Sequence, residues 1–181
     1  MKKIILLALM VPVVFCAGCS PRKEAPPETP EKTEYFDFTV EEFVEELSSD
    51  YLIRLKPLQS FTDEETSSTY AVYTYSTEDD TSYTKMFYYI TYDNTTEKVS
   101  RINFSVDKSF MGDIKYALAR YYYHTDAVVK IIDPSADVEK IWDSISFSTD
   151  ETGSTSMYKG KNFTLLATNT ESNFDSSFLT N

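Results

Sequence analysis

The feature of this chain that most constrains its fold is a series of three runs rich in β-forming residues. The runs cover residues 69–76, 82–92 and 98–106, and short polar segments that suit hairpin turns separate them. The third run alternates, so that apolar residues share one face and polar residues, among them Arg101 and Asn103, share the other. Because consecutive strands with such short links usually pair side by side, the runs predict an antiparallel meander.

Helical patterns flank this meander on both sides. Residues 39–49 begin with the Thr-x-x-Glu spacing of a capping box, which predicts a helix with an apolar stripe. Apolar residues at helical spacing predict a second helix over residues 110–132, either unbroken or ending near His124. The Asp-Pro pair that follows predicts a stop and a third helix over residues 134–145.

The remaining strand signals lie near the two ends of the domain. Residues 51–58 predict a first strand that a proline limits, and residues 59–68 predict a polar loop. A final hairpin is expected from residues 154–158 and 163–170, and the tail after it can add an edge strand. Together these elements predict an α+β fold. Its antiparallel β-sheet combines the meander with the C-terminal hairpin, and about three helices pack on one face.

The first nineteen residues have the features of an export signal. Two lysines follow the first methionine, residues 4–15 are apolar, and two small residues precede Cys19. The apolar run is shorter than the roughly 20 residues that a helix needs to cross a bilayer. The pattern therefore predicts a signal peptide over residues 1–18, with cleavage before Cys19.

The four residues Cys16-Ala17-Gly18-Cys19 resemble the lipobox of bacterial lipoproteins, although Cys16 replaces the usual leucine. The resemblance implies that Cys19 becomes a diacylated N-terminus and attaches the chain to the lipid membrane, on the extracytoplasmic face of the cell membrane. Residues 19–34, with four prolines among charged residues, would then form a tether, and residues 35–181 a single α+β domain. The order of the predicted elements is also similar to that of small, often uncharacterised lipoproteins of Gram-positive bacteria.

The charge of the chain limits its partners. Its formal net charge is −12. A protein surface with this negative charge repels nucleic acid phosphates, so no nucleic acid partner is expected. The same charge would attract cationic peptides or metal ions, although its simplest effect is to keep an exported protein soluble. Once the signal peptide is removed, Cys19 is the remaining cysteine, and no disulfide is expected within the domain.

Few residues in the sequence support catalytic chemistry. His124 is the one histidine, no Gly-x-Ser-x-Gly motif accompanies it, and we expect it on the surface or at the end of a helix. The possible zinc ligands are too few and the glycines too far apart for a phosphate cradle, so no metal site and no cofactor is expected. Acidic groups at residues 63–65, 79–80 and 150–151 fall in apparent loops, where a solvated turn is the ordinary explanation.

The most informative binding signal is an aromatic strip in the second β-rich run. Its more apolar face should lie against the helices, which leaves Tyr83, Phe87 and Tyr89 on the other face. On the next strand, Arg101 and Asn103 share that face. Rings beside polar donors suit a peptide or a sugar. The competing interpretation is that tyrosine is favoured in strands and that the tail or another element covers the face.

These observations favour a non-enzymatic binding or accessory module, anchored to the membrane, that contacts an extracellular peptide, glycan or protein. One alternative is an extracytoplasmic, glycan-acting hydrolase that uses two paired carboxylates. Another is an inhibitor or immunity protein whose rigid acidic sheet blocks a secreted basic enzyme.

Overall fold

The computed structural model describes residues 35–75, 85–145, 147–148 and 150–181. All of them belong to one compact unit. The predicted signal peptide, Cys19, the tether and Tyr83 lie outside the described residues. In chain order, the elements are α1 (Val40–Asp50), β1 (Leu55–Asp63), β2 (Ser68–Tyr75), β3 (Met86–Asp93), β4 (Val99–Asp107), the short 3₁₀ helix η1 (Phe110–Gly112), α2 (Ile114–Ile132), α3 (Val138–Ser144), β5 (Ser154–Lys159), β6 (Phe163–Asn169) and β7 (Asn173–Thr180).

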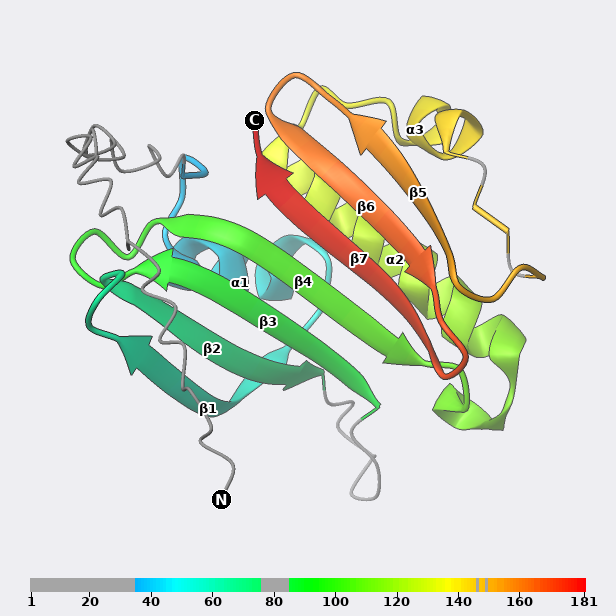
Figure 1. The fold of residues 1–181 in the computed structure, drawn as a ribbon, viewed down its shortest axis with the longest axis horizontal. Coiled ribbons are helices and arrows are strands. Elements are labelled where there is room, and N and C mark those ends of the chain that lie inside the picture. Colours follow the sequence, from blue (N-terminus) through cyan, green and yellow to red (C-terminus); the bar gives the residue numbers. More distant parts are fainter. Residues whose placement is uncertain (1–34, 76–84, 146, 149) are drawn as a thin grey trace, which may run out of the picture. The chain divides into compact units, whose positions relative to one another are not determined.

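The seven strands form one antiparallel sheet in the order β1-β2-β3-β4-β7-β6-β5. Figure 1 shows α1 and α2 behind this sheet, with α2 running behind its β6–β7 side and α3 next to β5. The α+β class, the antiparallel sheet and the helices on one face are confirmed. The second helix is unbroken as far as Ile132, after a 3₁₀ turn. Among the described residues, no helix is both long and apolar enough to cross a membrane.

The first strand differs from its prediction. It starts at Leu55 and continues to Asp63, so the first half of the segment predicted as a polar loop is a strand paired with β2. Its sequence is mostly polar because β1 is an edge strand whose side chains are largely exposed. Pro57 is tolerated there because an edge strand has one unpaired side, and the register shifts between Pro57 and Gln59.

The last strand also differs from its prediction, because β7 is not an edge strand. It lies in the interior of the sheet, paired with β4 on one side and β6 on the other. Phe174, Ser176 and Phe178 alternate along it and are all buried. The tail therefore joins the meander to the C-terminal hairpin and makes one continuous sheet.

The third helix is shorter than predicted and begins at Val138. The Asp133 carboxylate accepts hydrogen bonds from the Ser135 backbone N–H at 3.0 Å and the Ser135 hydroxyl at 2.6 Å. This turn occupies the segment after Pro134. Asp137 then caps α3 by accepting from the Lys140 backbone N–H at 3.3 Å.

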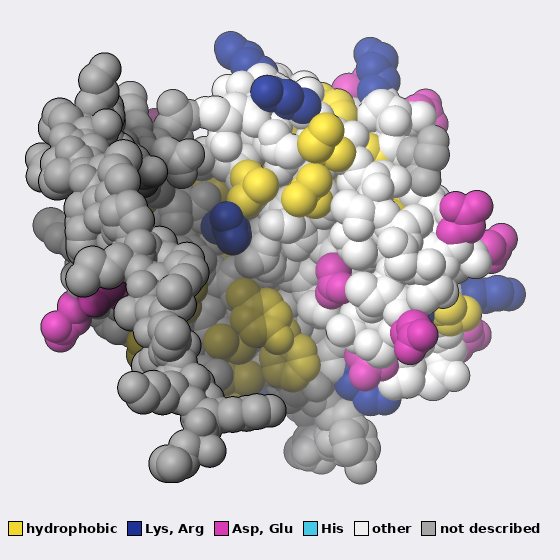
Figure 2. All heavy atoms as spheres, in the orientation of Figure 1, with side chains coloured by type: hydrophobic (Ala, Val, Ile, Leu, Met, Phe, Trp, Pro, Cys, Tyr) yellow, Lys and Arg dark blue, Asp and Glu magenta, His cyan; other side chains and the backbone are white. Residues whose placement is uncertain are grey.

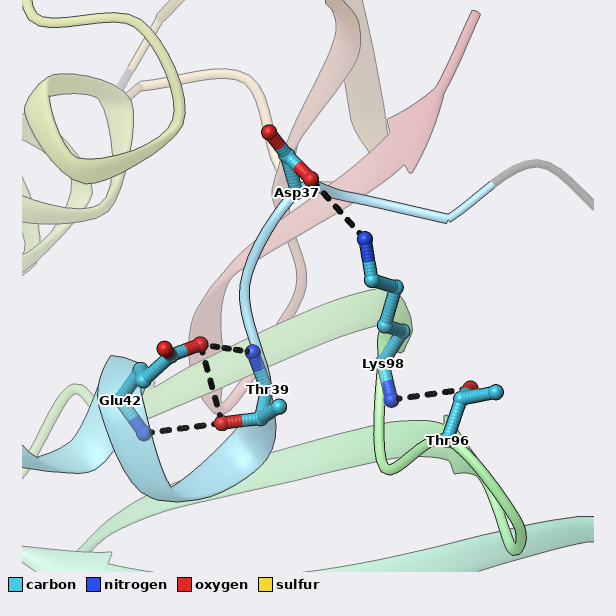
Figure 3. Close-up of polar contacts among 5 residues, drawn as sticks. All are labelled: Asp37, Thr39, Glu42, Thr96 and Lys98. Atoms are coloured by element: carbon cyan, nitrogen blue, oxygen red, sulfur yellow. Dashed lines mark hydrogen bonds and ion pairs between the residues drawn. The ribbon is translucent and has the colours of Figure 1, made fainter.

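The start of α1 is built as the sequence predicts (Figure 3). The Thr39 backbone N–H donates to the Glu42 carboxylate at 2.7 Å, and the Glu42 N–H donates to the Thr39 hydroxyl at 3.3 Å. The carboxylate also accepts from the Thr39 hydroxyl at 3.1 Å, and the two bonds that it accepts from Thr39 hold the pKa of Glu42 below its usual value. Phe38 stacks on Phe43 at 5.6 Å between ring centres, which completes a hydrophobic staple. Backbone hydrogen bonds from residues 36–40 to the start of β4 fix this end of the helix against the sheet.

Candidate functional site

The strands present two chemically different faces. Met86, Tyr88 and Ile90 of β3 are fully buried on the helix side, whereas Phe87 and Tyr89 point to the opposite, open face. Figure 2, in the orientation of Figure 1, shows hydrophobic side chains on the open face in two groups, with mainly polar surface between them. The sheet therefore has one face in the core and one face that carries both apolar and polar groups.

The structure brings two of the predicted site residues together on this open face. Tyr89 is 44% exposed and lies directly opposite Asn103 in the pairing of β3 with β4. Phe87 is half-buried, with its ring 6.3 Å from that of Tyr89. Arg101 is exposed opposite Thr91, one outward-facing position beyond Asn103. The remaining predicted member, Tyr83, lies outside the described residues.

Tyr89 and Asn103 line a groove of about 390 Å³ that crosses β3, β4, β7 and β6. Its volume is within the range of small-molecule sites in proteins. Arg101 and Phe87 do not line it. Leu166 and Thr168 of β6 line it as well, together with Asp175 and Ser177 of β7.

The polar groups of the groove are short and close together. The Ser177 hydroxyl donates to the Asn103 carbonyl oxygen at 2.5 Å, which leaves the two amide N–H donors of Asn103 without a partner among the described residues. The hydroxyls of Thr168 and Thr155 are 3.0 Å apart at the β5–β6 side. The groove thus presents a fixed amide and several hydroxyls along its length.

Asp175 supplies the one carboxylate among the described residues that line the groove. Burial raises the pKa of this carboxyl, although a hydrogen bond from Ser105 and the charge of Lys108 act in the opposite direction. A glycoside hydrolase of the usual kind needs two carboxyl groups facing each other. The described part of this groove does not assemble such a pair.

Sequence reasoning missed the half of the groove that β6 and β7 contribute. Residues 173–180 do alternate between apolar and polar positions, and that signal places Asp175 and Ser177 together on one face. Nothing in the local sequence places β7 beside β4, however, because pairing between strands about 70 residues apart is not a local property. The sequence alone could therefore not identify Ser177 as the hydrogen-bond partner of Asn103.

A larger hollow, of about 880 Å³, lies between α1 and strands β1 and β2. Val44, Leu55 and Tyr73 give it an apolar floor, and glutamates of α1 lie at its margin. We place the candidate site in the smaller groove, because its polar groups converge there and include a carboxyl with a shifted pKa.

His124 is not on the surface or at a helix end, as the sequence led us to expect. It is fully buried within α2, and its Nδ1 lies 2.8 Å from the Tyr88 hydroxyl. Its Nε2 has no hydrogen-bond partner among the described residues. Burial, with a smaller effect of the Arg120 charge, lowers the pKa of His124 to about 3. The imidazole is therefore a neutral component of the core.

The described acidic side chains do not gather elsewhere into an obvious centre. No group of three or more His, Cys, Asp or Glu side chains in the described parts of the chain is arranged to hold a metal ion. Asp63, in one of the acidic groups noted in the sequence, accepts a hydrogen bond from the Glu65 backbone N–H at 3.0 Å and so stabilises a turn. Residues 79–80 lie outside the described residues.

Comparisons with known proteins add no assignment. No family model matches the chain, and no curated protein or solved structure is significantly similar to it.

Proposed function

We propose that this protein is a membrane-anchored, extracytoplasmic lipoprotein whose domain is a non-enzymatic binding module. The observation that carries the proposal is the groove on the open face of the sheet. There an exposed tyrosine, an amide whose N–H donors have no partner in the described part of the chain, and a half-buried carboxyl line one hollow. Aromatic surface gives contact area, and fixed polar groups orient a ligand, which is the usual composition of a binding site.

The proposed anchor limits where the ligand lies. The lipobox-like residues put the acyl chains on Cys19, and about fifteen tether residues separate that cysteine from the domain. A proline-rich segment extends at about 3.1 Å per residue, so the domain would stand at most about 45 Å from the lipid. We therefore propose a component of the surrounding cell envelope as the ligand.

Acylation at Cys19 is testable with a matched cysteine control. Cells that express the wild-type chain or Cys16→Ser should incorporate an alkyne-tagged palmitate into the protein, whereas Cys19→Ser should incorporate none. The reason is that the thioether forms only at the residue that becomes the new N-terminus. In-gel fluorescence after click labelling measures the incorporation. Label retained by Cys19→Ser, or absent from the wild type, would contradict the anchor.

Binding through the groove is testable with two tyrosines of equal exposure. Tyr89 is 44% exposed and lines the groove, whereas Tyr70 is 45% exposed on the same face but outside it. We expect Tyr89→Ala to weaken binding to envelope fragments about tenfold, since it removes a ring contact worth about 1.4 kcal/mol. Tyr70→Ala should change binding less than twofold.

The measurement uses the full chain in mild detergent and detergent-washed envelope fragments from the cells that produce it. Sedimentation of the fragments at increasing protein concentration gives the apparent affinity of each variant. Equal affinities for the wild type and Tyr89→Ala would show that the groove does not bind an envelope component. Equal losses in both tyrosine variants would indicate general adhesion of the face.

A further inference from the structure

We infer that the ligand of this groove is a neutral carbohydrate chain. The inference rests on the proposed binding function and adds the chemical class of the ligand. Three properties of the groove lead to it: the pairing of its strands, the kind of polar groups that line it, and the position of its apolar walls.

The pairing of the strands makes an extended peptide a poor ligand. All four strands that form the groove are interior to the sheet, and each is paired on both sides. Their backbone N–H and C=O groups are therefore used within the sheet, and a peptide in the groove cannot add to it as a further strand. Strand addition is confined to the edge strands, β1 and β5. The ligand must be recognised by side chains.

The polar side chains of the groove match hydroxyl groups. Asn103 has amide N–H donors to offer, Thr168 and Ser177 carry hydroxyls, and Asp175 offers two carboxyl oxygens. Hydroxyls and amides both donate and accept, as sugar hydroxyls do. A planar carboxylate or amide can also contact two adjacent hydroxyls of a sugar ring at once. This set of partners favours a ligand that is rich in hydroxyl groups.

The charge of the groove argues against an anionic ligand. No lysine or arginine is among the described residues that line it, whereas Asp175 is. The chain as a whole has a net charge of −12. An anionic polymer in the groove would lose its hydration without meeting a lysine or arginine among the described lining residues, so we infer a neutral carbohydrate.

The apolar walls match the C–H faces of sugar rings. The exposed ring of Tyr89 lies on the β3 side of the groove, and Leu166 lies on the β6 side. The polar groups of β4 and β7 lie between these walls, because β4 and β7 lie between β3 and β6 in the sheet. A pyranose has the same pattern, with apolar C–H faces and a polar rim.

Selective destruction of the envelope components tests the inference. Periodate cleaves the carbon–carbon bond between adjacent hydroxyl-bearing carbons of sugars, and proteinase K removes proteins. We expect periodate treatment of the envelope fragments to lower wild-type binding at least tenfold, and proteinase K treatment to leave it within twofold. Asp175→Asn, which keeps the shape of the side chain, should weaken binding to untreated fragments severalfold.

Salt dependence separates a neutral ligand from a charged one. Binding of a neutral carbohydrate should change less than twofold between 20 mM and 500 mM NaCl, because no ion pair forms across the interface. A fall of tenfold or more would show that the ligand is charged and would overturn the inference.

The outcomes distinguish the inference from the function on which it rests. One outcome is that proteinase K abolishes binding, periodate does not, and Tyr89→Ala still binds more weakly than wild type. This result overturns the inference of a carbohydrate ligand and leaves the binding function in place. Binding that both treatments leave intact overturns a carbohydrate that the groove recognises through adjacent hydroxyls. Binding that does not depend on Tyr89 removes the function and the inference together.

Discussion

Replacing Phe104 with alanine is expected to lower the free energy of unfolding by about 4 kcal/mol, as truncations of buried phenylalanines commonly do. The side chain is buried, and its ring lies between the sheet and α2. It packs on Tyr88 at 5.2 Å, Tyr121 at 5.7 Å and His124 at 5.6 Å between ring centres. Alanine would leave a cavity among three rings that cannot close without moving α2. Urea unfolding followed by circular dichroism measures the change.

Phe61 gives the matched control for this substitution. It is also a phenylalanine on a strand, but it is 67% exposed on edge strand β1. Phe61→Ala removes the same atoms without opening a cavity, and we expect it to change the free energy of unfolding by less than about 0.5 kcal/mol. A similar cost for both variants would contradict the core that we describe around Phe104.

The parts of the fold that sequence predicts correctly are those with local physical causes. The capping box at Thr39 and Glu42 is closed by groups three residues apart, so its spacing is sufficient to identify it. The face of β3 and β4 on which each residue lies follows from alternation alone. Tyr89 and Asn103 were recognised as neighbours on the open face because a short turn joins their strands.

The parts that sequence did not predict depend on contacts between distant segments. Alternation shows which face of β7 carries Asp175 but not which strands lie beside it, so half of the groove was not foreseen. The same is true of β1, whose polar residues pair with β2 although they resemble a loop. His124 is expected on the surface or at the end of a helix because no catalytic motif accompanies it in the sequence, yet it forms a buried hydrogen bond with Tyr88 of a distant strand.

Acid should destabilise this domain through His124. The pKa of the imidazole is about 3 in the folded state, against about 6.5 in an unfolded chain. Between these values the unfolded state binds a proton that the folded state does not, so stability falls as the pH decreases. The stabilising contribution of neutral His124 to the folded state is fully present above pH 6.5. It decreases by up to about 1.4 kcal/mol per pH unit, which amounts to about 2 kcal/mol between pH 6.5 and pH 4.5.

Other titrating groups change the stability mainly outside the range from pH 6.5 to pH 4.5, or they stabilise the folded state as the pH falls. The described groups that face the buried imidazole from other elements are the aromatic rings of Tyr75, Tyr88 and Phe104. On α2 itself, the charge of Arg120 acts on the ring and lowers the pKa of His124 further. Exposed carboxylates with a lowered pKa lose their stabilising effect mainly below pH 4.5. Asp126 and Asp175 have a raised pKa, so their protonation favours the folded state as the pH falls.

The difference between wild type and His124→Gln isolates the histidine. Glutamine cannot take up a proton, so the stability of His124→Gln should vary less with pH by about 2 kcal/mol between pH 6.5 and pH 4.5. Tyr88→Phe removes the hydroxyl at 2.8 Å but keeps the imidazole, and it should keep the acid dependence of the wild type. Urea unfolding at each pH measures all three proteins. If the curves of stability against pH were parallel for wild type and His124→Gln, the imidazole would take up its proton as readily in the folded protein as in the unfolded chain. The unpartnered Nε2 among these aromatic rings argues against that outcome.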